Sequence, residues 1–201
     1  MPQHTVTVKT IDNIGLQDAS NALNTLIVQN FVPDIIIGIR TGGYVIAEIM
    51  AKELQPTPLL LAISRQRTGT QKKSRIKCLK KILSFLPYGI TDYLRIAEHK
   101  YLHSKPAAER KSFSPNLDEL ATLRGALRIR ENYKILIVDD AIDSGETMKA
   151  VLDVVRAEAS SACVIKTAAI TVTTDSPLVQ PDYTLYRYVL CRLPWSFDFK
   201  S

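Results

Sequence analysis

Hydrophobic and polar positions form two different patterns along this chain of 201 residues. Uninterrupted apolar runs are typical of strands buried on both faces, and apolar residues that recur every three or four positions are typical of helices. The apolar runs lie at 35–39, 59–63 and 135–138, and a further strand is predicted over 163–172. The helical spacings lie at 16–27, 45–54, 117–127 and 148–155. Because strands and helices alternate, the sequence predicts a doubly wound α/β fold with a mostly parallel sheet covered on both faces.

Two parts of the chain depart from this alternation. Residues 65–116, called the basic segment below, are polar and rich in lysine and arginine, with an amphipathic helix predicted over 76–86. We interpret this stretch as an insertion or mobile lid within a single domain of residues 1–201. The tail from 183 to 195 is predicted to form a late strand. Together the tail and the basic segment are expected to form a hood over the sheet.

Composition narrows the class of protein. The chain has 26 Lys and Arg against 20 Asp and Glu, a formal charge of +6, which suits phosphate-rich ligands but equally suits a solvated surface. Cys78, Cys163 and Cys191 are odd in number and lack paired spacing, which argues against a disulfide framework or a zinc site. No signal-peptide pattern or membrane-spanning run occurs in the sequence. We therefore expect a cytoplasmic protein that does not contact a membrane.

The segment 135–147 has the strongest chemical pattern in the chain. Its apolar strand ends in Asp139 and Asp140, at the sheet edge where ligands of open parallel sheets bind. Two adjacent carboxylates can accept hydrogen bonds from neighbouring sugar hydroxyls. Residues 144–147 then offer hydroxyls and consecutive N–H groups at the start of a helix, which suits a phosphate. Two alternatives stay open: such acids also occur at metal sites and in ordinary loops, and Ser-Gly-x-Thr can simply cap a helix.

This segment resembles the motif with which type I phosphoribosyltransferases bind phosphoribosyl pyrophosphate (PRPP). The resemblance implies that Asp139 and Asp140 bind the ribose and its Mg²⁺, and that Asp143 is the catalytic general base. It also implies a homodimer. An earlier segment, 40–43, is similar to the family's pyrophosphate loop, in which the Arg40–Thr41 peptide is expected to be cis. The residues thereby assigned to PRPP are Arg40, Thr41, Gly42, Gly43, Asp139, Asp140, Asp143, Ser144, Gly145, Glu146 and Thr147.

The tail is similar to the end of purine phosphoribosyltransferases, in which a segment before a Pro-aromatic pair covers the base. The candidate base-binding residues are Tyr188, Leu190, Cys191 and Trp195. The tail departs from the family pattern at two places. Leu190 stands where the family has an aromatic residue, and Thr173 and Thr174 stand where it has a lysine. The tyrosines and Trp195 can also be read as ordinary core or rim aromatics.

The basic segment allows three interpretations. As the family's flexible loop, it would close over the diphosphate with Arg65, Arg67, Lys72 and Lys73. As an accessory surface, its basic cluster would meet nucleic acid or another anionic partner. As a plain amphipathic helix, it would rest its apolar stripe on the domain and keep its charges in water.

The resemblance implies an enzyme of nucleotide salvage. It would be a pentosyltransferase that moves ribose 5-phosphate from PRPP to a nitrogen of a nucleobase, with a purine favoured, and releases pyrophosphate. The alternative is a PRPP-binding regulatory or sensor protein that has lost its acceptor site, for which the missing lysine and Leu190 argue. A nucleic-acid-binding module is the third possibility and the least favoured.

Overall fold

The computed structural model describes residues 5–66, 86–104 and 114–200. Its centre is a five-stranded sheet in the order β3-β2-β4-β5-β6, in which each neighbouring pair is parallel. The strands are β2 (Ile35–Ile39), β3 (Leu59–Ile63), β4 (Lys134–Ile142), β5 (Val164–Val172) and β6 (Tyr183–Arg187). The predicted parallel α/β sheet is confirmed, and the apolar runs at 35–39 and 59–63 coincide with β2 and β3.

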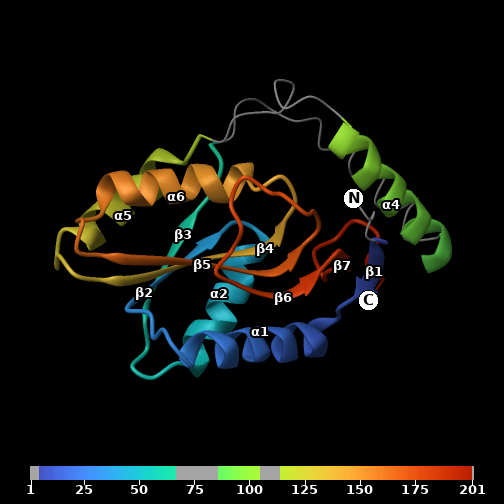
Figure 1. Cartoon of the computed structure of the whole chain (residues 1–201). Helices are drawn as coiled ribbons and strands as arrows, with labels where there is room; N and C mark the ends of the chain where they lie inside the picture. The colour runs from blue at the N-terminus through green and yellow to red at the C-terminus, as the bar shows by residue number, and fades with distance from the viewer. Residues whose placement is uncertain (1–4, 67–85, 105–113, 201) are drawn as a thin grey trace.

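Helices cover both faces of this sheet (Figure 1). One face carries α1 (Asn13–Val28) and α2 (Gly42–Glu53), and the other carries α5 (Leu117–Leu127) and α6 (Glu146–Glu158). Neighbouring residues of one strand enter different cores: Ile36 packs with the residues of α1 and α2, while Ile35 packs with those of α5 and α6. Because both faces of β2 are buried, this strand is apolar without alternation.

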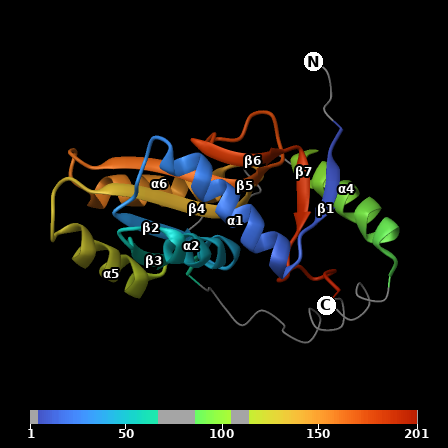
Figure 2. The ribbon, with the colours of Figure 1, turned by 90° about the horizontal axis from the view of Figure 1, so that it is seen from below.

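A second, two-stranded sheet stands beside the main one. Here β1 (Thr7–Thr10) pairs in parallel with β7 (Val189–Arg192), and α4 (Tyr88–Ser104) lies alongside them (Figures 1 and 2). We call β1, β7, α4 and residues 193–200 the hood. The predicted tail strand is therefore two strands, because the chain turns at Tyr188, whose φ is 59°.

The two ends of the basic segment lie side by side next to the main sheet. Arg65 forms an isolated antiparallel bridge with Pro115, and the Gln66 N–H donates to the Ser114 carbonyl at 2.7 Å. The helix predicted over 76–86 lies, up to residue 85, outside the described residues. The sequence pattern did not predict α4, which follows directly. No helix in the described ranges is long and apolar enough to cross a membrane.

A buried arginine holds the hood together. Arg192 is only 1% exposed, and its guanidinium donates to Thr10 Oγ1 of β1 at 2.7 Å and to Asp198 Oδ2 at 2.8 Å. It also donates to Asp92 of α4, and Arg95 of α4 donates to the same Asp198. One ionic cluster therefore joins all parts of the hood, and it fixes α4, which belongs to the basic segment, against the tail.

The hood cluster predicts a specific loss of stability in acid. Burial alone would raise the pKa of Asp198, but hydrogen bonds from Arg95 and Arg192 outweigh burial and lower the pKa to about 2. Asp198 therefore contributes its full stabilisation above the ordinary pKa of 3.8 and loses it as the pH falls toward 2. We expect this contribution to be about 2 kcal/mol. Asp198→Asn should remove it at neutral pH, which urea unfolding at several pH values would measure.

The matched control for this experiment is Glu48→Gln. Glu48 pairs with Lys52 at 3.3 Å on the exposed side of α2, where an ion pair contributes less than about 1 kcal/mol. Equal stability losses for the two variants, or an unchanged acid transition in Asp198→Asn, would contradict a stabilising role of the hood cluster.

Candidate active site

The carboxyl ends of β2 and β4 bring the two predicted ligand segments together. The strands are parallel neighbours, with Gly38 opposite Val138. Residues 40–43 follow β2 at once, while β4 continues through Asp139 and Asp140. Ligands of open parallel sheets bind in the crevice outside the carboxyl ends of the strands. Both segments identified in the sequence therefore lie at the edge where a ligand is expected.

The loop after β2 touches the acid pair through its two glycines. A Cβ atom on Gly42 would lie 2.0 Å from Asp140 Oδ2, and one on Gly43 would lie 2.4 Å from the Val138 carbonyl oxygen. No larger residue fits at either position without moving the backbone or the acid. The Arg40–Thr41 peptide is cis, as the resemblance implied.

The two acids are held in different environments. Asp139 is 8% exposed, and its Oδ1 accepts the N–H of Asp140 at 2.9 Å. Burial, followed by the charge of Asp140, raises the pKa of Asp139 well above its usual range. Asp140 is partly exposed, and its Oδ1 accepts the N–H of Ala141 at 3.0 Å. The pair thus concentrates negative charge in a partly desolvated place, which hydroxyl donors or a cation would stabilise.

The turn after β4 contains the residues predicted to bind a phosphate. Gly145 has a φ of +77° and is followed at once by α6, which begins at Glu146. Positive φ of this kind favours glycine. The turn is covered from outside, because the Leu178 N–H donates to the Ser144 carbonyl at 2.8 Å. The N–H groups of the first turn of α6 accordingly begin at the same sheet edge as the acid pair.

Asp143 stands between the acid pair and this turn. Its carboxylate accepts a hydrogen bond from the Thr173 hydroxyl, and its carbonyl accepts one from the Thr174 hydroxyl at 2.9 Å. These threonines directly follow β5, where the resemblance had suggested a lysine. In this chain the two residues therefore fix the position and orientation of Asp143.

Arg40 has an acidic partner that the sequence did not reveal. Its Nε lies 3.1 Å from Glu119 Oε1, and its guanidinium lies 4.9 Å from the centre of the Tyr44 ring. The other oxygen of Glu119 accepts both the N–H and the hydroxyl of Ser64, the latter at 2.7 Å. Because Ser64 directly follows β3 and Glu119 is in the first turn of α5, this carboxylate joins the residues that flank the basic segment to the loop after β2.

The four candidate base-binding residues lie in or beside the hood. Leu190 and Cys191 are in β7, opposite Val8 and Lys9 of β1, and burial raises the pKa of the Cys191 thiol to about 11. Tyr188 donates its hydroxyl to Asp175 in the loop after β5. Trp195 reaches the acid pair, since its indole N–H donates to Asp140 Oδ2 at 2.9 Å.

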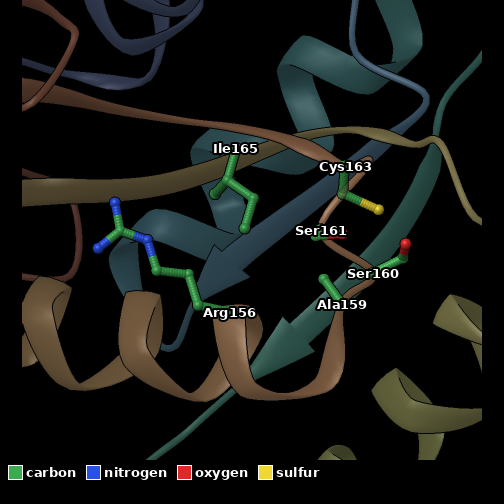
Figure 3. A pocket seen from close by; sticks show the side chains of 6 residues that line it. All are labelled: Arg156, Ala159, Ser160, Ser161, Cys163 and Ile165. Carbon is green, nitrogen blue, oxygen red and sulfur yellow. The ribbon is translucent and has the colours of Figure 1, made fainter.

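A cavity of about 380 Å³ lies elsewhere, between the end of α6 and the start of β5 (Figure 3). It is lined by Arg156, Ala159, Ser160, Ser161, Cys163 and Ile165. This is the amino edge of the sheet, opposite the edge that carries the acid pair, so the cavity is not part of the candidate site.

The family of the chain follows from a match to a family model named phosphoribosyl transferase domain, which covers residues 8–199. The chain belongs to the phosphoribosyltransferase family. Its hood, whose strands are β1 and β7, is included in the match. A search of curated proteins found no match.

Solved structures with this phosphoribosyltransferase fold match nearly the whole chain. The purine phosphoribosyltransferase of Pyrococcus horikoshii Ot3 has a TM-score of 0.55 and 20% identity, with 93% of each chain covered. The Helicobacter pylori xanthine-guanine-hypoxanthine phosphoribosyltransferase has a TM-score of 0.52 and 14% identity, also with 93% of each chain covered. A hypothetical protein from Neisseria gonorrhoeae with bound ppGpp has a TM-score of 0.57 and 14% identity, with 96% of this chain and 91% of that chain covered. At these identities the likeness establishes the fold alone.

Glu119 is predicted to stabilise this member of the family mainly through Ser64. Glu119→Ala leaves the Ser64 N–H and hydroxyl without their acceptor and should cost about 1 to 3 kcal/mol of unfolding free energy. Glu119→Gln keeps an oxygen for Ser64 and should cost less. The control is Asp118→Ala, an exposed acid in the same helical turn, with an expected change within about 0.5 kcal/mol. Denaturant unfolding measures all three, and a Glu119→Ala variant as stable as Asp118→Ala would contradict the assignment.

Proposed function

We propose that this chain transfers ribose 5-phosphate from PRPP to a nucleobase nitrogen and releases pyrophosphate. The observation that carries the proposal is the contact between the glycine loop after β2 and the acid pair at the end of β4. A single substrate with a diphosphate on one side of its ribose would contact both the glycine loop and the acid pair. The turn at 144–147 follows β4, the strand that carries the acid pair, and it suits the 5-phosphate.

The proposal gives each part of the site a role toward PRPP. Asp139 and Asp140 accept hydrogen bonds from the ribose hydroxyls, and the turn 144–147 binds the 5-phosphate through its N–H groups and hydroxyls. Arg40 and the N–H groups of the loop 41–43 bind the diphosphate. This assignment is supported by the place of the loop, whose two glycines pack directly against Asp140 and the backbone of Val138.

The acid pair has the right chemistry for magnesium. Mg²⁺ prefers oxygen ligands and is often bound through carboxylates together with substrate phosphates. Asp139 and Asp140 supply such oxygens, and the raised pKa of Asp139 reflects burial and a neighbouring negative charge that a cation would offset. When bound with PRPP, Mg²⁺ would neutralise charge that develops on the leaving diphosphate.

The proposed transfer breaks one bond at the anomeric carbon of the ribose and forms another. The carbon–oxygen bond to the diphosphate breaks with its electron pair going to the oxygen, and the acceptor nitrogen supplies the pair for the new bond. Arg40 and the loop amides would stabilise the departing diphosphate. Asp143, oriented by Thr173, is the candidate group for the proton that leaves the nitrogen.

A purine-like acceptor is favoured by the structural neighbours, two of which are named for purine bases. The hood supplies the residues proposed to contact the base: Tyr188, Leu190, Cys191 and Trp195. The homodimer, the cytoplasmic location and the closing of the basic segment over the diphosphate stay predictions.

Magnesium-PRPP is expected to stabilise the protein against unfolding. At about 100 times its dissociation constant it should add roughly 2.7 kcal/mol, because a ligand that binds only the folded state shifts the equilibrium by mass action. The double variant Asp139→Asn, Asp140→Asn should abolish this gain, since amides accept sugar hydroxyls less strongly and do not favour the metal. Thermal melts with and without ligand make the measurement.

Asp153→Asn is the matched control for the loss of a carboxylate. Asp153 lies on the exposed side of α6 and pairs with Lys149, away from the acid pair. Its PRPP response should equal that of the unmodified protein. A flat melt at saturating magnesium-PRPP, together with no heat of binding by calorimetry, would rule the proposal out.

Asp143→Asn separates chemistry from binding. If Asp143 takes the acceptor proton, turnover should fall by about two orders of magnitude while PRPP affinity stays within a few fold. The assay measures pyrophosphate release with magnesium, PRPP and a panel of purines, pyrimidines and orotate. Equal losses of affinity and turnover would make Asp143 part of the phosphate site instead. PRPP binding without turnover on any acceptor would favour the sensor alternative.

A further inference from the structure

Trp195, the one tryptophan of the chain, makes a contact that the proposed reaction does not use. Its indole N–H donates to Oδ2 of Asp140 at 2.9 Å. The ring also rests against the glycine loop, since a Cβ atom on Gly42 would lie 2.8 Å from its Cζ2. A single side chain of the tail therefore contacts both the acid pair on β4 and the glycine loop after β2.

The tail presents this indole from a fixed turn. The Ser196 N–H donates to the Leu193 carbonyl at 2.8 Å, and the Leu193 N–H donates back to the Ser196 hydroxyl at 3.0 Å. Further along, Asp198 is anchored by the buried Arg192. Trp195 itself is half-buried and packs on the core cluster of α1 and α2. The position of its N–H is therefore set by the hood.

The contact fixes the orientation of the Asp140 carboxylate. One oxygen accepts the N–H of Ala141 at 3.0 Å, and the other accepts the indole N–H. A carboxylate oxygen can accept more than one hydrogen bond, so each oxygen keeps a direction for another donor. A carboxylate already held in place loses little side-chain freedom when a ligand binds, which favours affinity.

We infer that Trp195 is a positioning residue for the ribose of PRPP: its N–H holds Asp140 in the orientation that accepts the sugar hydroxyls. The inference rests on the proposed function, because it takes PRPP as the ligand of Asp140. It differs from the predicted base-binding role, which uses the face of the indole ring, whereas positioning uses the N–H. The two roles separate when the N–H alone is removed.

Trp195→Phe makes that separation, because phenylalanine keeps an aromatic face but has no N–H. A hydrogen bond to a charged group corresponds to about a tenfold change in an equilibrium constant. We expect the Kd of magnesium-PRPP, measured by calorimetry without base, to rise about tenfold. The KM for PRPP should rise with it, and by a larger factor than the KM for the base.

Tyr186→Phe is the matched control. Like Trp195→Phe, it removes one polar group from an aromatic side chain. The hydroxyl that is lost accepts a hydrogen bond from Lys9 at 3.0 Å and does not touch the acid pair. Its PRPP affinity should equal that of the unmodified protein. Trp195→Phe with unchanged PRPP affinity would overturn the inference, and so would tighter binding or a rise in the KM for the base alone.

Failure of the proposed function gives a different result from failure of the inference. Unmodified protein that does not bind PRPP overturns both. Normal binding that is insensitive to Trp195→Phe overturns only the positioning role.

Should Trp195→Phe fail to fold, the fluorescence of the unmodified protein supplies the test. The emission of the one tryptophan should shift when magnesium-PRPP binds without base. Without ligand, the emission of the Asp140→Asn variant should differ from that of the unmodified protein. Emission that responds to neither change would overturn the inference.

Discussion

The register of β2 against β4 is the constraint on which the site depends. Because Gly38 lies opposite Val138, the chain that leaves β2 meets the end of β4 at backbone distance, with Gly43 against the Val138 carbonyl. A side chain on either glycine of the loop would have to part the strands or displace the acid pair. The proposed sites for diphosphate and ribose are therefore fixed relative to each other by strand pairing. The loops alone would not hold them so closely.

Carboxylates serve two opposite purposes in this fold, and their neighbours decide which. Asp198 is nearly buried between two guanidinium groups, which lower its pKa to about 2, so its charge is neutralised within the protein and holds the hood together. Asp139 is equally buried, yet its charged neighbours are carboxylates, and its pKa is raised. A cluster of the second kind is stabilised by a ligand from outside. Perturbed groups of this type are concentrated at functional sites.

The sequence predicted the elements that are set by local pattern and missed those set by distant partners. The apolar runs gave β2 and β3 residue for residue; β2 is buried on both faces, and β3, although partly exposed at the sheet edge, keeps the same apolar pattern. The short strand β1 was missed, since its residues are mostly exposed and it depends on pairing with β7. The role of Glu119 was missed for a similar reason: its partner Ser64 lies 55 positions away. The same separation hides the contact of Trp195 with Asp140.

Charge balance bears on the predicted role of the basic segment. The edge that carries Asp139, Asp140 and Asp143 would repel a diphosphate, and the nearby cation, Arg40, is already paired with Glu119. A polyanionic ligand therefore requires further positive charge. Magnesium supplies part of it in the proposed function. The chain carries its excess of lysine and arginine mainly in the basic segment, and Ser64 and Glu119, which flank this segment, are hydrogen-bonded beside that arginine. If the basic segment closes over the diphosphate, as the lid interpretation predicts, its lysines and arginines would supply this charge.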